Sequence, residues 1–459
     1  MIALVILIVT ALVILYAGLY RFSKALLPIS LLGIIAALAS MISAWDHPKY
    51  YFAETLFIDN YAIAFSSLLL VTSGLIFLLS SNYFEKISSN VAEYYALILF
   101  ALVGALCLIS YQNLSMLFIG IEIMSVSLYI LAGIRKNDPF SNEAALKYFL
   151  MGSFATGFLL FGIALLYGAT GTFNIEQIAN VIQSGNVLHT PILYGGVLMI
   201  IVGLSFKVSA APFHFWAPDV YQGSPALITA FMSTVVKTAG IGAFYKLFAT
   251  SFTGLEQLWV PAITVIVIAT LVIGNFTAAY QLNFKRLLAY SSISNAGYLL
   301  IGIVTASAFS AGSVFFYAAA YSIASVIAFA VLILIKNKTG NTDIASFAGL
   351  GKTNPGLAFA LTLSMCSLAG IPLTAGFFGK FMIFSSAISQ QLVWLCVIAV
   401  INSAIGIYYY FKVVKVMYTS NSESEIEISI PTGFKVVLSV CALFILLFGV
   451  YPDFLINLF

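Results

Sequence analysis

The sequence predicts an all-α polytopic membrane protein with about 14 transmembrane helices. Of its 459 residues, 62% are hydrophobic and only 8% are charged, whereas soluble domains are roughly half apolar and a quarter charged. A helix that crosses the hydrocarbon core needs about 20 mostly apolar residues, and the chain divides repeatedly into runs of that length. The composition therefore excludes a soluble globular protein.

The expected spans follow one another with short polar connections. The first run has neither the basic segment nor the cleavage site of a signal peptide, so we expect it to be retained. Asp138 and Pro139 predict the start of the sixth span, because aspartate caps helices and proline is tolerated at the first helical position. Pro225 similarly opens the eighth. The fourteen spans are 1–20, 25–45, 61–80, 91–110, 113–134, 139–168, 191–213, 225–250, 258–280, 286–306, 309–335, 355–388, 391–418 and 433–458.

Basic residues between the spans indicate the orientation in the membrane. Loops rich in lysine and arginine stay in the cytoplasm. The loops that follow odd-numbered spans hold 13 such residues, among them Arg21, Lys86, Lys285 and Arg286, and the opposite side holds two, Lys49 and Lys246. We therefore expect both termini on the non-cytoplasmic side. Lys246, near a helix end, is expected to extend its amine to the membrane interface.

Five charged residues fall inside the expected spans: Glu122, Lys147, Lys207, Lys237 and Lys380. Charges at membrane depth are costly and usually mark a binding site or an ion pathway. Lys147 lies eight residues after Pro139, which is roughly 12 Å into the membrane at 1.5 Å per residue. A structural ion pair is the alternative for Glu122. A carboxylate and an amine that are desolvated together nevertheless influence each other's protonation, as proton transfer requires.

Two of the spans contain helix breakers. The seventh contains Lys207-Val-Ser-Ala-Ala-Pro212, and the twelfth contains glycines and Pro372 shortly before Lys380. Proline removes a backbone donor and frees carbonyl groups, which is tolerated at membrane depth only against protein or a water-filled cavity. Two breaks, each with a lysine, suggest internal repeats. His214 follows the first break, where we expect it at the cytoplasmic mouth, either as a proton relay or as an interfacial residue.

Motifs for cofactor, metal or nucleic-acid binding are absent from the sequence. There is no GxGxxG, phosphate-binding loop, CxxCH or nucleophile elbow. The three histidines are isolated and the four cysteines form no CxxC pair, so we expect neither a metal site nor a disulfide framework. The basic residues are scattered rather than arranged in a stripe, which disfavours nucleic acid as a partner. The expected surroundings are lipid, and the expected cargo is protons.

Six segments resemble the antiporter-like subunits of respiratory complex I. They are GIEIMSVSLY (120–129), ALKYF (145–149), GLSFKVSAAPFHFWAPDVY (203–221), KRLLAYSS (285–292), GIP (370–372) and GK (379–380). The chain is most similar to the subunit N branch of this family. A second branch has a glutamate in place of Lys380, and a third continues into a long lateral helix.

The resemblance implies a fold of two inverted five-helix repeats, each with a broken helix, and a chain of buried ionisable residues. It implies a three-helix segment at 1–90, repeats at 91–250 and 258–418, and a loop with a last helix at 419–459. Glu122 and Lys207 match the family's glutamate–lysine pair, Lys147 a lysine that modulates it, Lys237 the central lysine, and Lys380 the lysine of the second half-channel. Asn295 departs from the family, in which histidine is common, so the second half-channel would depend more on bound water.

The expected function is that of a proton-translocating membrane-arm subunit of a bacterial NADH:quinone oxidoreductase. The resemblance implies an inner-membrane location with periplasmic termini, and neighbouring membrane-arm subunits that include a paralogue of this chain. NADH, FMN, iron–sulfur clusters and quinone are expected in partner subunits, with no cofactor in this chain. Two alternatives stay open: a subunit of a multisubunit cation/proton antiporter, and a scaffold subunit with vestigial charges.

Overall fold

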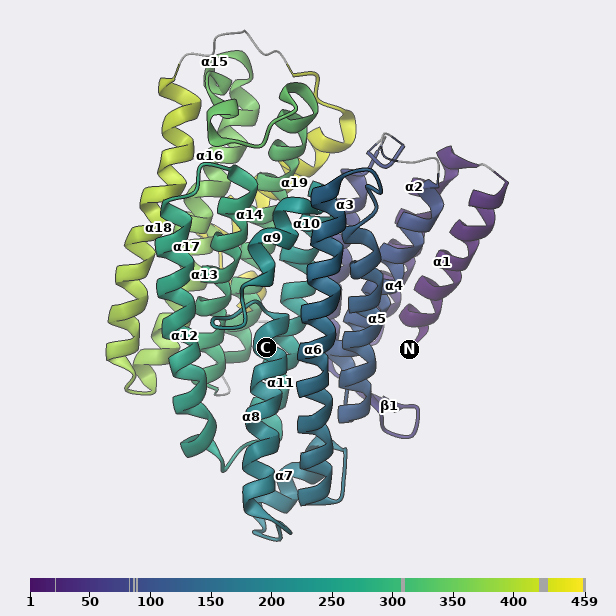
Figure 1. Cartoon of the computed structure of the whole chain (residues 1–459), viewed down its shortest axis with the longest axis vertical. Helices are drawn as coiled ribbons and strands as arrows, with labels where there is room; N and C mark the ends of the chain where they lie inside the picture. The colour runs from purple at the N-terminus through teal and green to yellow at the C-terminus, as the bar shows by residue number, and fades with distance from the viewer. Residues whose placement is uncertain are drawn as a thin grey trace.

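A computed structural model describes residues 1–20, 22–81, 83–85, 87, 90–306, 310–420 and 428–456. Helices run roughly side by side through most of the molecule (Figure 1). Within the described ranges, the strands form one antiparallel hairpin, β1 Lys49–Tyr51 and β2 Leu56–Ile58, with Tyr50 opposite Phe57. Arg21 and Lys86, which contributed to the predicted orientation, lie outside the described residues.

The helices follow the order of the expected spans. The first eight are α1 Ile2–Leu19, α2 Ser23–Ile42, α3 Asn60–Leu78, α4 Val91–Ser110, α5 Leu114–Ala132, α6 Pro139–Thr170, the short α7 Ile175–Gln183 and α8 Thr190–Lys207. Next come α9 Trp216–Gly223, α10 Ala226–Phe231, a π-helical turn Met232–Val236, α11 Lys237–Thr250, α12 Glu256–Ala279, α13 Phe284–Val304 and α14 Ser310–Thr339. The chain ends with a 3-10 turn Ile344–Phe347, α15 Leu350–Thr353, α16 Pro355–Ala369, α17 Ala375–Ser389, α18 Val393–Thr419, α19 Thr432–Val450 and α20 Asp453–Ile456.

The predicted membrane protein with broken helices is confirmed. Among the described residues, 13 helical stretches are long and apolar enough to cross a membrane, with Ala226–Thr250 counted as one. Helices α16 and α17 have 15 residues each, and they follow one another across a break at 370–374. Together they account for the remaining expected span. The chain is therefore a multi-pass membrane protein.

Burial divides the helices into a centre and a periphery. The apolar windows of α14 and of Ala226–Thr250 are wholly buried, whereas only a third of the windows of α1, α2 and α6 is buried. In Figure 1 the hairpin and α7 lie at one end of the bundle, and α15 lies at the other. Lys237 stands on one of the central stretches, and so the fold shields it from lipid on all sides.

Polar side chains begin several helices as the sequence predicts. Asp138 Oδ1 accepts a hydrogen bond from the Phe140 amide at the start of α6, directly before Pro139. Asn113, Asn174 and Asn283 cap α5, α7 and α13 in the same way. These contacts satisfy amides that have no partner within the helix.

The two breaks satisfy their backbone groups within the protein. At the first, Trp216 Nε1 donates to the Phe206 carbonyl at 3.1 Å, and the Ala211 amide donates to Thr270 Oγ1 at 2.8 Å. At the second, Gly370 ends α16 with φ +84°, a conformation that glycine adopts without strain. Irregular backbone at membrane depth requires such internal partners.

Helices α4 and α5 approach closely through facing glycines. A Cβ atom added at Gly104 would lie 2.6 Å from the Met124 amide nitrogen and 2.8 Å from the Gly120 carbonyl oxygen. Both atoms belong to the backbone, so they cannot move aside as a flexible side chain would. Small residues commonly allow such close packing between membrane helices.

We therefore expect Gly104→Ala to destabilise the protein, because overpacking costs about 1–3 kcal/mol. Gly157→Ala is the matched control, since an added Cβ there meets nothing within 4 Å. Thermal unfolding in detergent should show a lower midpoint for Gly104→Ala and little change for Gly157→Ala. Equal midpoints would contradict the close packing of α4 on α5.

Candidate functional site

Lys207 ends α8 at the first break, in a buried position. Its side chain is 6% exposed, and Nζ donates to Ser125 Oγ of α5 at 2.8 Å. Glu122 lies three residues before Ser125, half-buried, and forms no ion pair with Lys207. The carboxylate of Glu122 acts on Lys207 electrostatically, without direct contact. A small cavity of about 10 Å³ adjoins Lys207, Ser125 and Tyr129, and this is about the room needed by one water molecule.

Lys147 differs from its predicted environment. We expected it to approach the membrane midplane, but its side chain is 38% exposed and makes two ion pairs. Its Nζ lies 2.6 Å from Glu143 and 2.7 Å from Asp219 of α9. Arg286 of α13 contacts the second oxygen of Asp219 at 2.8 Å. The distance along α6 does not tell which face of the helix carries the amine, and the expected depth of Lys147 in the membrane stays a prediction.

Lys237 occupies the centre of the bundle. It directly follows the π-helical turn, is 2% exposed, and donates from Nζ to the Ser292 carbonyl of α13 at 2.6 Å. No local sequence pattern predicts this turn, and π-helical turns occur frequently at functional sites. Lys237 thus contacts the helix that also carries Asn295.

Asn295 joins a buried set of hydroxyl groups on the far side of Ser292. Its side-chain amide donates to the Ser291 carbonyl at 2.8 Å, and its oxygen accepts from Tyr317 OH at 2.6 Å. The hydroxyls of Ser291 and Tyr410 lie 2.5 Å apart. Hydroxyl groups both donate and accept hydrogen bonds, so this cluster offers the contacts that a histidine would otherwise make.

Lys380 stands beside the second break. It is 5% exposed, and Nζ donates to the Ala369 carbonyl and to Ser403 Oγ, both at 3.0 Å. The same nitrogen lies 4.7 Å from the ring centre of Tyr298. Ala369 is the last residue of α16, so its carbonyl is one of those that the break leaves available. The second break thus supplies an acceptor to its lysine, as the freed carbonyl groups led us to expect.

His214 lies within the first break rather than at an exposed mouth. It is 5% exposed, and its Nδ1 has no hydrogen-bond partner among the described residues. Helix α9 begins two residues after it and runs for eight residues. His214 is therefore buried in the protein at the break, and its place at the cytoplasmic mouth stays a prediction.

Two further lysines are more buried than the sequence suggested. Lys285, expected in a loop, is 1% exposed in the first turn of α13, where Nζ donates to the carbonyls of Gln222 and Ser224. Lys246, expected at the interface, is 8% exposed. Both lie near helix ends, where position along the chain does not distinguish a loop-facing amine from one that points into the bundle.

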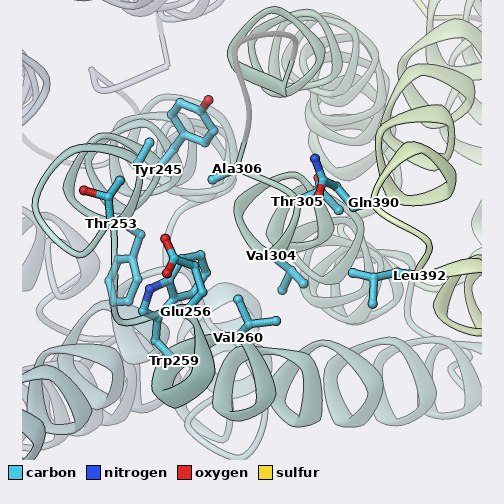
Figure 2. A pocket seen from close by; sticks show the side chains of 12 residues that line it. Tyr245, Thr253, Glu256, Trp259, Val260, Val304, Thr305, Ala306, Gln390 and Leu392 are labelled. Atoms are coloured by element: carbon cyan, nitrogen blue, oxygen red, sulfur yellow. The ribbon is translucent and has the colours of Figure 1, made fainter.

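A pocket near the end of α11 does not contain the lysines. It measures about 530 Å³ and lies where α11, α13 and α17 end and α12 begins, lined by residues that include Tyr245, Glu256, Trp259, Thr305 and Gln390. Figure 2 shows Glu256 beside Trp259 on one side of the pocket and Gln390 on the other. Among the described residues, no group of three or more histidines, cysteines or acids is placed to hold a metal ion.

Comparisons with known proteins agree with this geometry. The family described as "NADH:quinone oxidoreductase/Mrp antiporter, TM" matches residues 111–406. Subunit N of NADH-quinone oxidoreductase from Cytophaga hutchinsonii is 41% identical over 444 residues, which cover 96% of this chain and 95% of the relative. The subunit N from Trichlorobacter lovleyi is 40% identical and covers 94% of this chain and 88% of the relative.

A solved structure shows the same arrangement of helices. A chain of respiratory complex I from Thermus thermophilus, solved with bound aureothin, is 31% identical with a TM-score of 0.86, covering 99% of this chain and 98% of that one. The resemblance seen in the sequence motifs is thereby confirmed over nearly the whole chain. The chain belongs to the NADH:quinone oxidoreductase/Mrp antiporter family of membrane subunits, and its curated relatives are NADH-quinone oxidoreductase subunits N.

Proposed function

We propose that the chain translocates protons as a membrane-arm subunit of NADH:quinone oxidoreductase. The redox chemistry of NADH, FMN, iron–sulfur clusters and quinone belongs to partner subunits, and this chain holds no redox group. The function of this chain is to take up, transfer and release protons through buried amines, hydroxyl groups and water. Members of the same family in the membrane arm, including a paralogue, are the proposed neighbours.

One observation carries this proposal: three buried lysines are held by neutral acceptors. Lys207 contacts a serine hydroxyl, Lys237 a carbonyl, and Lys380 a carbonyl and a hydroxyl. A carboxylate partner would hold an ammonium in its charged form, whereas a neutral acceptor leaves both protonation states accessible. Lys147, bound to two carboxylates, is the contrasting case. We assign it a positioning role that links α6 to the first broken helix.

The proposed route has two halves that meet at Lys237. In the first half, Glu122 acts electrostatically on Lys207, and His214 in the adjoining break serves as a further relay. In the second half, the hydroxyls of Ser291 and Tyr410 bridge the distance past Asn295, whose amide cannot readily exchange its protons. Each hydroxyl accepts a proton on its oxygen and gives up its own. Lys380 then receives the proton beside the second break.

The arrangement also supports the two inverted repeats. We assign residues 91–250 to the first and 258–418 to the second, with 1–90 and 419–459 as flanking segments. The broken helix α8–α9 begins at the hairpin end of the bundle, and α16 begins at the opposite end, as inversion requires. From the distribution of basic loops we place both termini on the periplasmic side of a bacterial inner membrane.

A cation/proton antiporter subunit is the second candidate, because the matching family contains both kinds of protein. The two candidates differ in what drives transport. Proton movement should follow NADH oxidation in the first case and a sodium gradient in the second. Transport measured in vesicles, with NADH and with a sodium gradient in turn, separates them. A scaffold role would leave transport insensitive to replacement of all three lysines.

Lys237→Met should remove most NADH-driven proton pumping while the complex still assembles, because the central site can no longer carry a proton. Lys237→Arg should also fail, since a guanidinium scarcely deprotonates. Lys338→Met, an exposed lysine at the end of α14, is the matched control. Proton uptake by inside-out vesicles measures the effect. Normal pumping by an assembled Lys237→Met enzyme would reject the relay.

Glu122→Gln and Lys207→Met should affect pumping non-additively, because each residue's charge influences the protonation of the other. A double-mutant cycle on the initial pumping rate measures this coupling, which we expect to exceed about 1 kcal/mol. Ser125→Ala should lower the rate less than Lys207→Met, since it removes only a hydrogen-bond acceptor. If the losses of the two charged residues simply multiply, they act independently.

Labelling with a membrane-impermeant maleimide should place the hairpin in the periplasm and α15 in the cytoplasm. Lys49→Cys on β1 should react in intact cells, whereas Lys352→Cys on α15 should react only after the membrane is opened. Both side chains are exposed at opposite ends of the bundle. The reverse pattern would invert the proposed orientation.

A further inference from the structure

Two deeply buried lysines, Lys246 and Lys285, are not used by the proposed route. Lys246 stands near the end of α11 with 8% of its surface exposed, and its Nζ has no hydrogen-bond partner among the described residues. The nitrogen lies over two aromatic rings, 5.3 Å from the centre of Tyr111 and 5.9 Å from that of Phe57. Aromatic faces stabilise an ammonium only in part, so three N–H donors are left to satisfy.

Two other unpartnered polar atoms belong to the same place. Gln112 Nε2 and Thr55 Oγ1 are both buried without a hydrogen-bond partner among the described residues. A backbone hydrogen bond joins these segments, because the backbone N–H of Gln112 donates to the Thr55 carbonyl at 2.9 Å. Tyr111 and Phe57, the rings under Lys246, are the close neighbours of these residues in sequence. The three polar groups therefore belong to segments that are in contact, namely the start of β2, the α4–α5 turn and α11.

Water is the partner that fits these groups. Buried polar atoms are nearly always hydrogen-bonded, and ordered water commonly serves where protein atoms do not. The Lys246 ammonium and the side-chain amide nitrogen of Gln112 can only donate, whereas the threonine hydroxyl can accept. A water molecule accepts from the donors and donates to Thr55. We infer a hydrated site where the segments that carry these three side chains meet, and we call it the hairpin chamber.

Two carboxylates belong to elements at the hairpin end of the bundle, near Lys246. The charges of Asp59 and Glu176 both act on Lys246. Asp59 caps α3 by accepting from the Ala62 amide, and the exposed Glu176 of α7 accepts from Tyr50 OH at 3.5 Å. The tyrosine hydroxyl nearest the amine is already used, because Tyr111 OH donates to the Ala243 carbonyl at 2.9 Å. Protons leaving the chamber would thus meet acids at the hairpin end of the bundle.

Helix α11 connects the hairpin chamber to the interior. Lys237 begins this helix, and Lys246 follows nine residues later, about 13.5 Å along its axis. Lys207 packs against the same helix, since a Cβ added at Gly240 would lie 3.6 Å from Lys207 Cγ. The neighbouring Tyr245 lines the pocket of Figure 2 on another side of α11. Lys246 is the lysine of this helix that faces the hairpin.

We propose that Lys246 is a proton-exchange site through which the interior communicates with the hairpin side of the membrane. A proton released by Lys237 or Lys207 passes through water to the neutral amine of Lys246 and forms an N–H bond there. The ammonium then gives a proton to water of the hairpin chamber, which passes it towards Asp59 and Glu176. The number of protons on Lys246 is restored after each cycle. This inference rests on the proposed function of the chain.

The first experiment measures whether the chamber is wet. Lys246→Cys is placed in the assembled complex after Cys107, Cys366, Cys396 and Cys441 have been replaced by alanine. A small water-soluble thiol reagent added from the hairpin side should modify it about tenfold faster than Phe244→Cys, because only a hydrated thiolate reacts. Phe244 is fully buried on the same helix, so this control creates a cavity of similar size. Equal rates would overturn the proposal.

The second experiment measures transport by the intact enzyme in vesicles. Lys246→Met and Lys246→Arg should each lower the number of protons pumped per NADH by at least about a quarter, because neither side chain readily exchanges a proton. Lys49→Met, an exposed lysine on the same hairpin, should not change the ratio. Where Lys246→Met fails to assemble, Lys246→Arg carries the test, since it keeps the charge. Parental stoichiometry in either assembled variant would overturn the proposal.

The outcomes separate this inference from the proposed function. If Lys237→Met abolishes pumping while the Lys246 variants pump normally, translocation stands and the exchange site does not. If Lys237→Met itself pumps normally, the proposed function fails first. A loss of pumping in the variants of both lysines, together with rapid labelling at Lys246→Cys, supports both.

Discussion

The cost of an ammonium group in a low-dielectric interior is the constraint on which the site depends. A charge removed from water needs hydrogen-bond acceptors or a counter-charge nearby. Lys207, Lys237 and Lys380 each find a hydroxyl or a carbonyl within 3.0 Å. Regular helices offer few such acceptors, because their carbonyls are already used within the ladder. Lys380 takes the Ala369 carbonyl from the end of α16, whereas Lys207 and Lys237 use a serine hydroxyl of α5 and a carbonyl of α13.

Each irregularity of the backbone adjoins a particular lysine. The end of α16 presents the Ala369 carbonyl to Lys380, and α8 ends at Lys207 itself. The π-helical turn directly precedes Lys237, and at such a turn the helical register shifts by one residue. Neutral hydroxyl and carbonyl acceptors stabilise a charged amine without fixing it in that state. This distinguishes the three sites from Lys147, which two carboxylates hold in a charged network.

Much of this could be predicted from the sequence, because the signals are periodic or local. The lengths of the apolar runs predicted the membrane spans, and the positions of proline and glycine predicted both helix breaks. What failed was the direction of individual side chains. Lys147 donates to Asp219, which lies 72 residues away in the sequence. Lys285 donates to the carbonyl groups of Gln222 and Ser224 at the end of α9. Glu143, one turn before Lys147, was the available signal, since residues four apart share a helix face. The π-helical turn and the burial of Lys246 depend on tertiary packing, so no local pattern reveals them.

Asn295 shows how the fold accommodates a change in one relay position. An asparagine cannot titrate, so a route that depended on this side chain would stop there. The Ser291 and Tyr410 hydroxyls, however, lie beside it at hydrogen-bond distance, and Tyr317 donates to its oxygen. Asparagine thus orients hydroxyl groups that can themselves pass protons. Residue 295 then no longer carries a proton itself but positions the hydroxyl groups that do. Lys237 and Lys380, before and after it on the proposed route, keep their neutral acceptors. Continuity of exchangeable hydrogen-bonding groups, rather than a titratable residue at every step, is what the second half of the route requires.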